Sequence, residues 1–229
     1  NPLYEAFIEA GREAGYPVTK DMNGYQQEGL GLMDRTTYKG KRWSTARAYL
    51  RPAQKRNNLE VHSRTLVTKI LFEGRRASGV QYTRNGKLET VRTNGEVLLC
   101  GGAINSPHML QLSGIGNADA LKALGIPVVQ HLPGVGENLQ DHIEAYVQYS
   151  CTKPITLYSA NNPISKLLIG MQWVFTGGKG LGGSNHFESG GFIRSEAGVL
   201  HPDLQYHFFP MAISYDGTSA AEGHGYQAH

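Results

Sequence analysis

The sequence is short of cysteine and of long apolar runs, and each shortage argues against a class of protein. Its two cysteines, Cys100 and Cys151, lie far apart and show neither a metal-ligand nor a redox spacing. The longest apolar stretch, residues 164–174, is interrupted by Ser165, Lys166 and Gln172 and falls short of the roughly 18 residues that a membrane span needs. We therefore expect an intracellular protein, with a peripheral membrane contact left open.

Dense charge and a targeting pattern are also missing. The net charge of +3 is spread along 229 residues, with short clusters such as Lys39, Lys41 and Arg42, so no nucleic-acid partner is expected. The chain starts at Asn1-Pro2-Leu3 without an initiator methionine, and residues 225–229 resemble an unfinished strand. We expect an internal fragment of a longer protein that is inactive by itself.

Apolar periodicity and turn residues predict alternating helices and strands within a folded protein that is 40% hydrophobic. Gly15 follows the first helix where a left-handed cap is common, and Asn85-Gly86 is a strong hairpin signal. Helices are predicted over residues 3–14, 46–50 (capped by Ser44), 106–112, 119–124 and 163–175, and strands over 59–63, 66–72, 79–83, 87–92 and 97–100.

Residues 97–106 form the segment with the clearest cofactor-binding pattern. Val97-Leu98-Leu99-Cys100 has the all-apolar character of a strand buried in a parallel sheet, and it leads into two glycines and then a helix that Ser106 and Pro107 would open. Such a turn lets the backbone approach a phosphate or ribose, with helix N–H groups aimed at negative charge. Gly101, Gly102 and Ser106 are therefore candidate cofactor-binding residues, although the same turn also serves plain packing of a helix on a sheet.

The longer string from Gly101 to Gly116 closely resembles the second signature of the glucose–methanol–choline (GMC) oxidoreductases. Two further segments resemble the family in the same order, residues 40–50 and 133–142. The resemblance implies a mixed α/β fold. It implies part of an FAD-binding, Rossmann-like lobe over 1–141, with a β-hairpin region at 59–100, and part of an antiparallel-sheet substrate lobe over 142–229.

Residues 21–29, 185–194 and 202–208 resemble the choline-oxidising members of the family most. This implies FAD-dependent oxidation of choline to betaine aldehyde, in glycine betaine synthesis, with hydride transfer to the flavin and electrons passed to a quinone chain and not to oxygen. It also implies a mitochondrial inner-membrane protein in animals, or a membrane-associated or cytoplasmic one in bacteria. A homo-oligomer is left open, and the sequence does not by itself separate dehydrogenase from oxidase.

The resemblance also suggests which residues bind ligands. It places the adenine contact on Val67 and the choline ammonium on Glu188, with Phe187 beside it. A quaternary ammonium donates no ordinary hydrogen bond, so a carboxylate or an aromatic face suits it. The competing interpretations are a core valine and a solvated strand glutamate. His186, Tyr206 and His207 are further candidates for the pocket, on strand faces that the sequence does not distinguish.

No catalytic residue and no metal site are predicted in this chain. The family's Gly-x-Gly-x-x-Gly segment is not found here, and its catalytic histidine belongs to a later portion. Two other functions stay open. One is a GMC oxidoreductase that acts on another alcohol, and the other is a non-catalytic module with the same fold.

Overall fold

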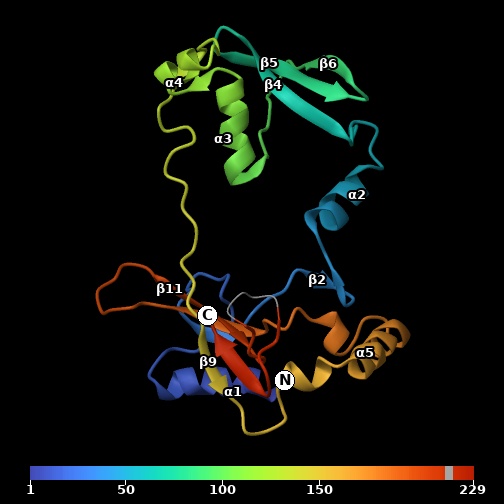
Figure 1. Cartoon of the computed structure of the whole chain (residues 1–229), viewed down its shortest axis with the longest axis vertical. Coiled ribbons are helices and arrows are strands. Elements are labelled where there is room, and N and C mark those ends of the chain that lie inside the picture. The colour runs from blue at the N-terminus through green and yellow to red at the C-terminus, as the bar shows by residue number, and fades with distance from the viewer. Residues whose placement is uncertain (215–218) are drawn as a thin grey trace. The chain divides into compact units, whose positions relative to one another are not determined.

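The computed structural model describes residues 1–214 and 219–229, and its contacts divide the chain into two compact units (Figure 1). The discontinuous unit combines residues 1–55 with 143–229, and the continuous unit comprises 56–142. The chain therefore passes between the two units twice, once after Lys55 and once near the predicted boundary at Asp141. The first 55 residues pack with the later segment, so residues 1–141 do not form one compact lobe. Which unit binds which ligand stays a prediction.

The discontinuous unit is built around a five-stranded antiparallel sheet with the order β1-β10-β11-β12-β9. No helix in the described part of the chain is long and apolar enough to cross a bilayer. The elements of the discontinuous unit are α1 (Pro2–Glu13), β1 (Gly29–Leu32), β2 (Thr37–Tyr38), β3 (Lys41–Arg42), the π-helix η1 (Ala46–Leu50), α2 (Arg51–Ala53), β9 (Val147–Ser150), the 3-10 helix η2 (Leu157–Ala160), α5 (Pro163–Phe175), the 3-10 helix η3 (Leu181–Gly183), β10 (Ser189–Ile193), β11 (Leu204–Phe209) and β12 (Gly225–Ala228).

Helix α1 packs across this sheet through aromatic side chains. Asn1 caps the N-terminal end of the helix by accepting a hydrogen bond from the Leu3 N–H. At the C-terminal end, Gly15 follows the last capping residue and adopts the left-handed conformation that was predicted. The Phe7 ring stacks on Phe208 with centroids 4.7 Å apart, and Tyr4 meets the same ring edge-on at 6.2 Å. These contacts join the start of the chain to residues that follow the continuous unit.

The turn between β2 and β3 lies against the end of α5 so closely that only glycine fits. Gly40 has a φ of 64°, and a Cβ added there would lie 1.9 Å from the Gly178 carbonyl oxygen. Gly74 has a nearly identical φ of 60° but no atom within 4 Å of its virtual Cβ. The two glycines therefore share a backbone requirement, but only Gly40 also lacks space.

We expect Gly40→Ala to destabilise the protein by more than about 3 kcal/mol, because backbone overlap adds to left-handed strain. Gly74→Ala is the matched control and should cost only the strain, about 1–2 kcal/mol. Denaturant unfolding of the full-length protein measures both. Equal losses for the two variants would show that the tight contact at Gly40 relaxes without cost.

The continuous unit pairs a three-stranded antiparallel meander with two helices. Its elements are β4 (Thr65–Glu73), β5 (Arg76–Arg84), β6 (Lys87–Arg92), α3 (Gly102–Leu112), β7 (Ile115–Gly116), α4 (Ala118–Ala123) and β8 (Gln130–His131). The Asn85-Gly86 hairpin is confirmed, with both residues at positive φ. Ser113 ties the end of α3 to the sheet, because its Oγ accepts a hydrogen bond from the Ile70 N–H at 2.8 Å.

Three predictions about the continuous unit are wrong. Residues 59–63 and 97–100 do not form strands, since a strand requires a hydrogen-bonded neighbour and no described segment pairs with either. Leu98 is 80% exposed and so is not buried in a sheet. Helix α3 begins at Gly102 and contains Pro107, so Ser106 and Pro107 do not open it.

Candidate functional site

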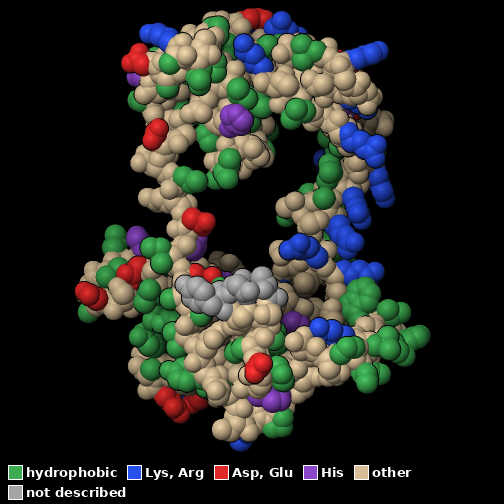
Figure 2. Space-filling model, in the orientation of Figure 1, with side chains coloured by type: hydrophobic (Ala, Val, Ile, Leu, Met, Phe, Trp, Pro, Cys, Tyr) green, Lys and Arg blue, Asp and Glu red, His purple; other side chains and the backbone are tan. Residues whose placement is uncertain are grey.

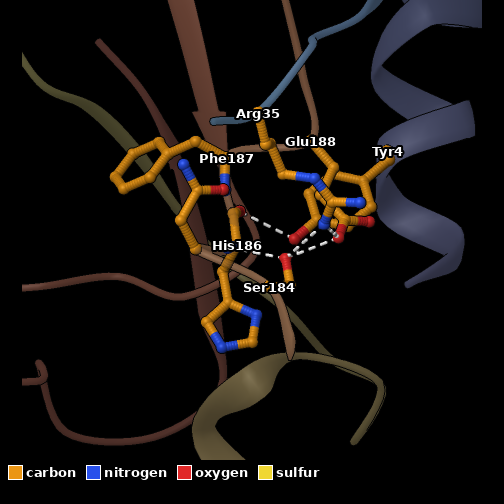
Figure 3. A network of polar contacts seen from close by, with 7 residues as sticks. Tyr4, Arg35, Ser184, His186, Phe187 and Glu188 are labelled. Atoms are coloured by element: carbon orange, nitrogen blue, oxygen red, sulfur yellow. Dashed lines mark hydrogen bonds and ion pairs between the residues drawn. The ribbon is translucent and has the colours of Figure 1, made fainter. Parts of the chain in front are cut away.

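Glu188, the predicted ammonium ligand, is the centre of a polar network within the discontinuous unit (Figure 3). It directly precedes β10, and its carboxylate pairs with Arg35 and accepts a hydrogen bond from the Ser184 hydroxyl. Arg35 also donates to Ser184 Oγ at 2.8 Å. The Glu188 and Arg35 side chains are 28% and 31% exposed. Because arginine stays protonated, the charge of Glu188 is already neutralised by a permanent cation.

The same network holds His186 in an unusual backbone conformation. His186 has a φ of 67°, its N–H donates to Ser184 Oγ at 2.9 Å, and its carbonyl accepts from the Tyr4 hydroxyl at 2.7 Å. Burial, with a smaller contribution from the nearby Glu188 charge, raises the pKa of Tyr4, and burial lowers the pKa of His186. Both side chains are therefore uncharged near neutral pH, and the network fixes the loop before β10.

Phe187 lies on the other side of the backbone from Glu188, as Figure 3 shows. Successive side chains of an extended segment point in opposite directions. The Phe187 ring stacks on Phe209 at 4.9 Å and on His229 at 5.5 Å, and His207 meets it edge-on at 6.1 Å. The structure therefore places the Phe187 and Glu188 side chains on opposite sides of this segment.

A different carboxylate, Glu144, borders this group of rings. Glu144 Oε1 lies 3.1 Å from His229 Nδ1, and Oε2 accepts a hydrogen bond from the Tyr146 hydroxyl at 3.0 Å. The Tyr146 and His229 rings lie 5.2 Å apart. We call Glu144, Tyr146, Phe187, His207, Phe209 and His229 the aromatic cluster.

Glu144 and Glu188 differ in their electrostatic surroundings. Burial lowers the pKa of His229, against the opposing effect of Glu144, so the imidazole beside Glu144 is mainly neutral at pH 7. The Glu144 side chain is 48% exposed and lies next to the rings of Tyr146 and His229. A carboxylate beside aromatic faces is the arrangement that suits a cation unable to donate hydrogen bonds.

In β11, Tyr206 and His207 point to opposite faces of the sheet, which the sequence alone did not assign. His207 belongs to the aromatic cluster, whereas the Tyr206 ring lies 6.3 Å from Phe7 of α1. Sequence reasoning did not find Glu144. The sequence signal that could have found it is the spacing of Glu144 and Tyr146, two residues apart just before β9, since this spacing places both side chains on one side of an extended chain.

The predicted cofactor residues lie in the continuous unit around a cavity of about 590 Å³. Val67 and Gly101 both line it, and its other walls are mostly apolar, including Val80, Val91 and Met109. Ser106 is linked to this site because its Oγ accepts a hydrogen bond from the Gly101 N–H at 3.0 Å. Gly102 starts α3 with a φ of 84° and free space at its Cα.

The cavity suits a flat, weakly polar ring better than it suits a phosphate. Its walls offer valine side chains and no Lys or Arg apart from Arg92. The N–H of Gly101, in the turn predicted to approach a phosphate or ribose, donates a hydrogen bond to Ser106 Oγ. Among the four predicted residues, the structure brings Val67 and Gly101 to one cavity and leaves Ser106 and Gly102 at its helical border.

The chain belongs to the GMC oxidoreductase family, since the family described as "GMC oxidoreductase" matches residues 1–144. The predicted family and the mixed fold of helices and antiparallel sheet are thereby confirmed. The chain is also similar to a solved structure, an FAD-dependent oxidoreductase from Chaetomium thermophilum. The two share 30% identity with a TM-score of 0.72, over 84% of this chain and 34% of that one.

Two curated relatives match the whole chain. "Choline dehydrogenase, mitochondrial" of Homo sapiens is 56% identical over 231 residues. "Oxygen-dependent choline dehydrogenase" of Chromohalobacter salexigens is 58% identical over 230 residues. The chain spans 38% and 41% of the lengths of these two proteins. It therefore corresponds to about two fifths of each relative.

Proposed function

We propose that the full-length protein oxidises choline to betaine aldehyde with FAD as its cofactor. The observation that carries this proposal is the identity of 56–58% to choline dehydrogenases along the entire chain. When bound, FAD supplies the hydride acceptor for alcohol oxidation. In this chain, the apolar cavity around Val67 and Gly101 suits the adenine ring, and Ser106 fixes the loop that carries Gly101.

We further propose that the aromatic cluster receives the trimethylammonium group of choline, with Glu144 as its counter-charge. The Phe187 ring is itself stacked on Phe209 and His229, so His207 and Tyr146 supply further aromatic surface at the edge of the cluster. Glu144 offers a charge that no permanent cation neutralises among the described contacts. The prediction that Glu188 makes this contact is less well supported, because binding there has to compete with Arg35. In our proposal Glu188 instead holds the loop that positions Phe187.

Anaerobic titration of the full-length protein with choline tests the proposal. Flavin absorption bands should be present and should bleach with choline, whereas an uncharged alcohol of the same shape, 3,3-dimethylbutan-1-ol, should require a much higher concentration. Equal bleaching by both alcohols would favour a GMC oxidoreductase with another substrate. A colourless full-length protein would favour the non-catalytic module.

Readmitting an acceptor to the bleached protein tests the final electron transfer. We propose a quinone acceptor, so a soluble quinone should restore the flavin bands faster than dissolved oxygen does. Faster recovery with oxygen is the alternative outcome, and the name of the Chromohalobacter salexigens relative, an oxygen-dependent choline dehydrogenase, is the reason to test it. Faster recovery with oxygen would make the protein an oxidase in practice and would leave the choline proposal intact.

A further inference from the structure

His229 brings an ionisable ring to the carboxylate of the aromatic cluster. Its Nδ1 atom lies 3.1 Å from Glu144 Oε1, and the His229 side chain is only 9% exposed. The ring stacks on Phe187 with centroids 5.5 Å apart and meets His207 edge-on at 5.9 Å. The backbone is held as well, because the His229 N–H donates to the His207 carbonyl at 3.0 Å. The imidazole therefore has a fixed place beside Glu144.

A buried glutamine on β12 faces the same nitrogen of His229. Gln227 is fully buried, and its Oε1 accepts hydrogen bonds from the Gln148 side-chain amide at 2.8 Å and from the Ile213 N–H at 3.0 Å. These two donors fix the orientation of the Gln227 amide, so its Nε2 group faces His229 Nδ1 at 3.5 Å. Because an amide N–H group is a donor, Gln227 favours an imidazole whose Nδ1 carries no proton.

The two polar neighbours of Nδ1 favour opposite states of the imidazole. Glu144 is an acceptor for a protonated Nδ1, whereas Gln227 is a donor to an unprotonated one. A neutral imidazole leaves the charge of the Glu144 carboxylate uncancelled, and an imidazolium cancels it by forming an ion pair. Burial lowers the pKa of His229, the Glu144 charge opposes this effect, and His207 adds to it.

No lysine or arginine belongs to the segments that build the aromatic cluster. Residues 123–152, 180–193 and 195–229 contain neither. Figure 2 shows a row of Lys and Arg side chains along α2 and its neighbouring segments, within the stretch 39–55. Of the two histidines in the cluster, His207 meets the Gln205 side chain at 2.9 Å, and among the described ion pairs only His229 reaches Glu144.

We propose that His229 is a specificity-determining residue, whose protonation sets the affinity of the aromatic cluster for a quaternary ammonium group. The inference rests on the proposed function, because it takes Glu144 as the counter-charge of choline. A cation beside Glu144 repels an imidazolium at Nδ1, and by reciprocity protonation of His229 weakens binding of the cation. An uncharged alcohol does not feel this coupling. The preference for choline is therefore greatest above the pKa of His229 and falls as the pH drops through it.

Inhibition of the full-length enzyme by tetramethylammonium tests the coupling. This ion has the charge of choline but no hydroxyl group, so its inhibition constant reports on the ammonium site alone. Measured against choline from about pH 8 down to about pH 5, the constant should rise about tenfold. The inhibition constant of tert-butanol, which is uncharged and has no carbinol hydrogen to lose, should stay nearly unchanged.

His229→Phe removes Nδ1 but keeps a ring in the stack on Phe187, so most of the rise in the inhibition constant should disappear. The remaining rise reports the protonation of Glu144 itself. His224→Phe is the matched control, because the His224 ring bonds to Thr156 Oγ1 at 2.7 Å instead of to a carboxylate. This control should show the same pH dependence as the unsubstituted enzyme.

Gln227→Glu tests the same inference through a shift instead of a loss. The variant keeps the size of the side chain and its acceptor for Gln148, but it replaces the donor that faces His229 Nδ1 by a carboxylate oxygen. The imidazolium then has two carboxylates beside it. The pH at which the inhibition constant rises should therefore move upward by about one pH unit.

The outcomes separate the inference from the function on which it rests. A constant that stays flat in the unsubstituted enzyme, an undiminished rise in His229→Phe or an unmoved midpoint in Gln227→Glu would each overturn the role of His229. An inhibition constant that Glu144→Gln leaves unchanged at about pH 8 would instead overturn the proposed ammonium site itself.

Discussion

Glu144→Gln in the full-length protein is expected to raise the KM for choline by about 10- to 100-fold with a smaller change in kcat. The substitution keeps the shape and the hydrogen-bond acceptor for Tyr146 but removes the charge that would face the ammonium group in the proposed site. Steady-state kinetics with choline and with 3,3-dimethylbutan-1-ol measure the effect. The variant should lose most of its preference for choline, because the neutral alcohol never used the charge.

Two companion variants separate this assignment from its competitor. Glu144→Asp retains the charge and should recover part of the affinity for choline. Glu188→Gln should affect stability more than KM, because Glu188 already pairs with Arg35. If Glu188→Gln raised the KM for choline and Glu144→Gln did not, Glu188 would be the ammonium ligand, as the resemblance implied.

Arg35→Met is expected to destabilise the protein by about 1–3 kcal/mol, because it leaves the partly buried Glu188 carboxylate without a counter-charge. The loss should appear as a lower midpoint of denaturant unfolding. Adding Glu188→Leu to this variant should restore part of the stability, since the unpaired charge is then gone.

An exposed ion pair supplies the control for this prediction. Lys122 and Asp119 lie 3.8 Å apart on α4, with side chains 69% and 94% exposed. Lys122→Met should therefore cost less than about 0.5 kcal/mol. If Arg35→Met cost equally little, water would be screening Glu188 and the network would not anchor the loop before β10.

Local signals predicted the elements whose causes lie within a few residues. Helix α5 was predicted over residues 163–175, which are its observed bounds, and the structure adds that the Asn162 side chain caps its start. The strand predicted over 97–100 failed for the opposite reason. Apolar character shows that a segment avoids water, but a strand also needs a partner, and partners are not encoded locally.

In the candidate site too, local sequence predicted some features, whereas contacts between distant segments were not predicted. The resemblance and residue chemistry together predicted Glu188, next to Phe187, as the ligand of the ammonium group, and this stays a prediction. What the sequence did not reveal was Arg35, which lies far from Glu188 in the chain yet neutralises it. The proximity of Glu144 to residues 187, 207 and 229 depends likewise on the order of strands in the sheet, which no single segment determines.

The split of the discontinuous unit has a consequence for biosynthesis. Strand β1 leaves the ribosome long before its neighbour β10, with the whole continuous unit emerging between them. Until then Tyr4 and Phe7 have no sheet to cover, while the meander of the continuous unit already has all its strands. The nascent chain therefore exposes the apolar side of helix α1 until β10 and β11 have been synthesised.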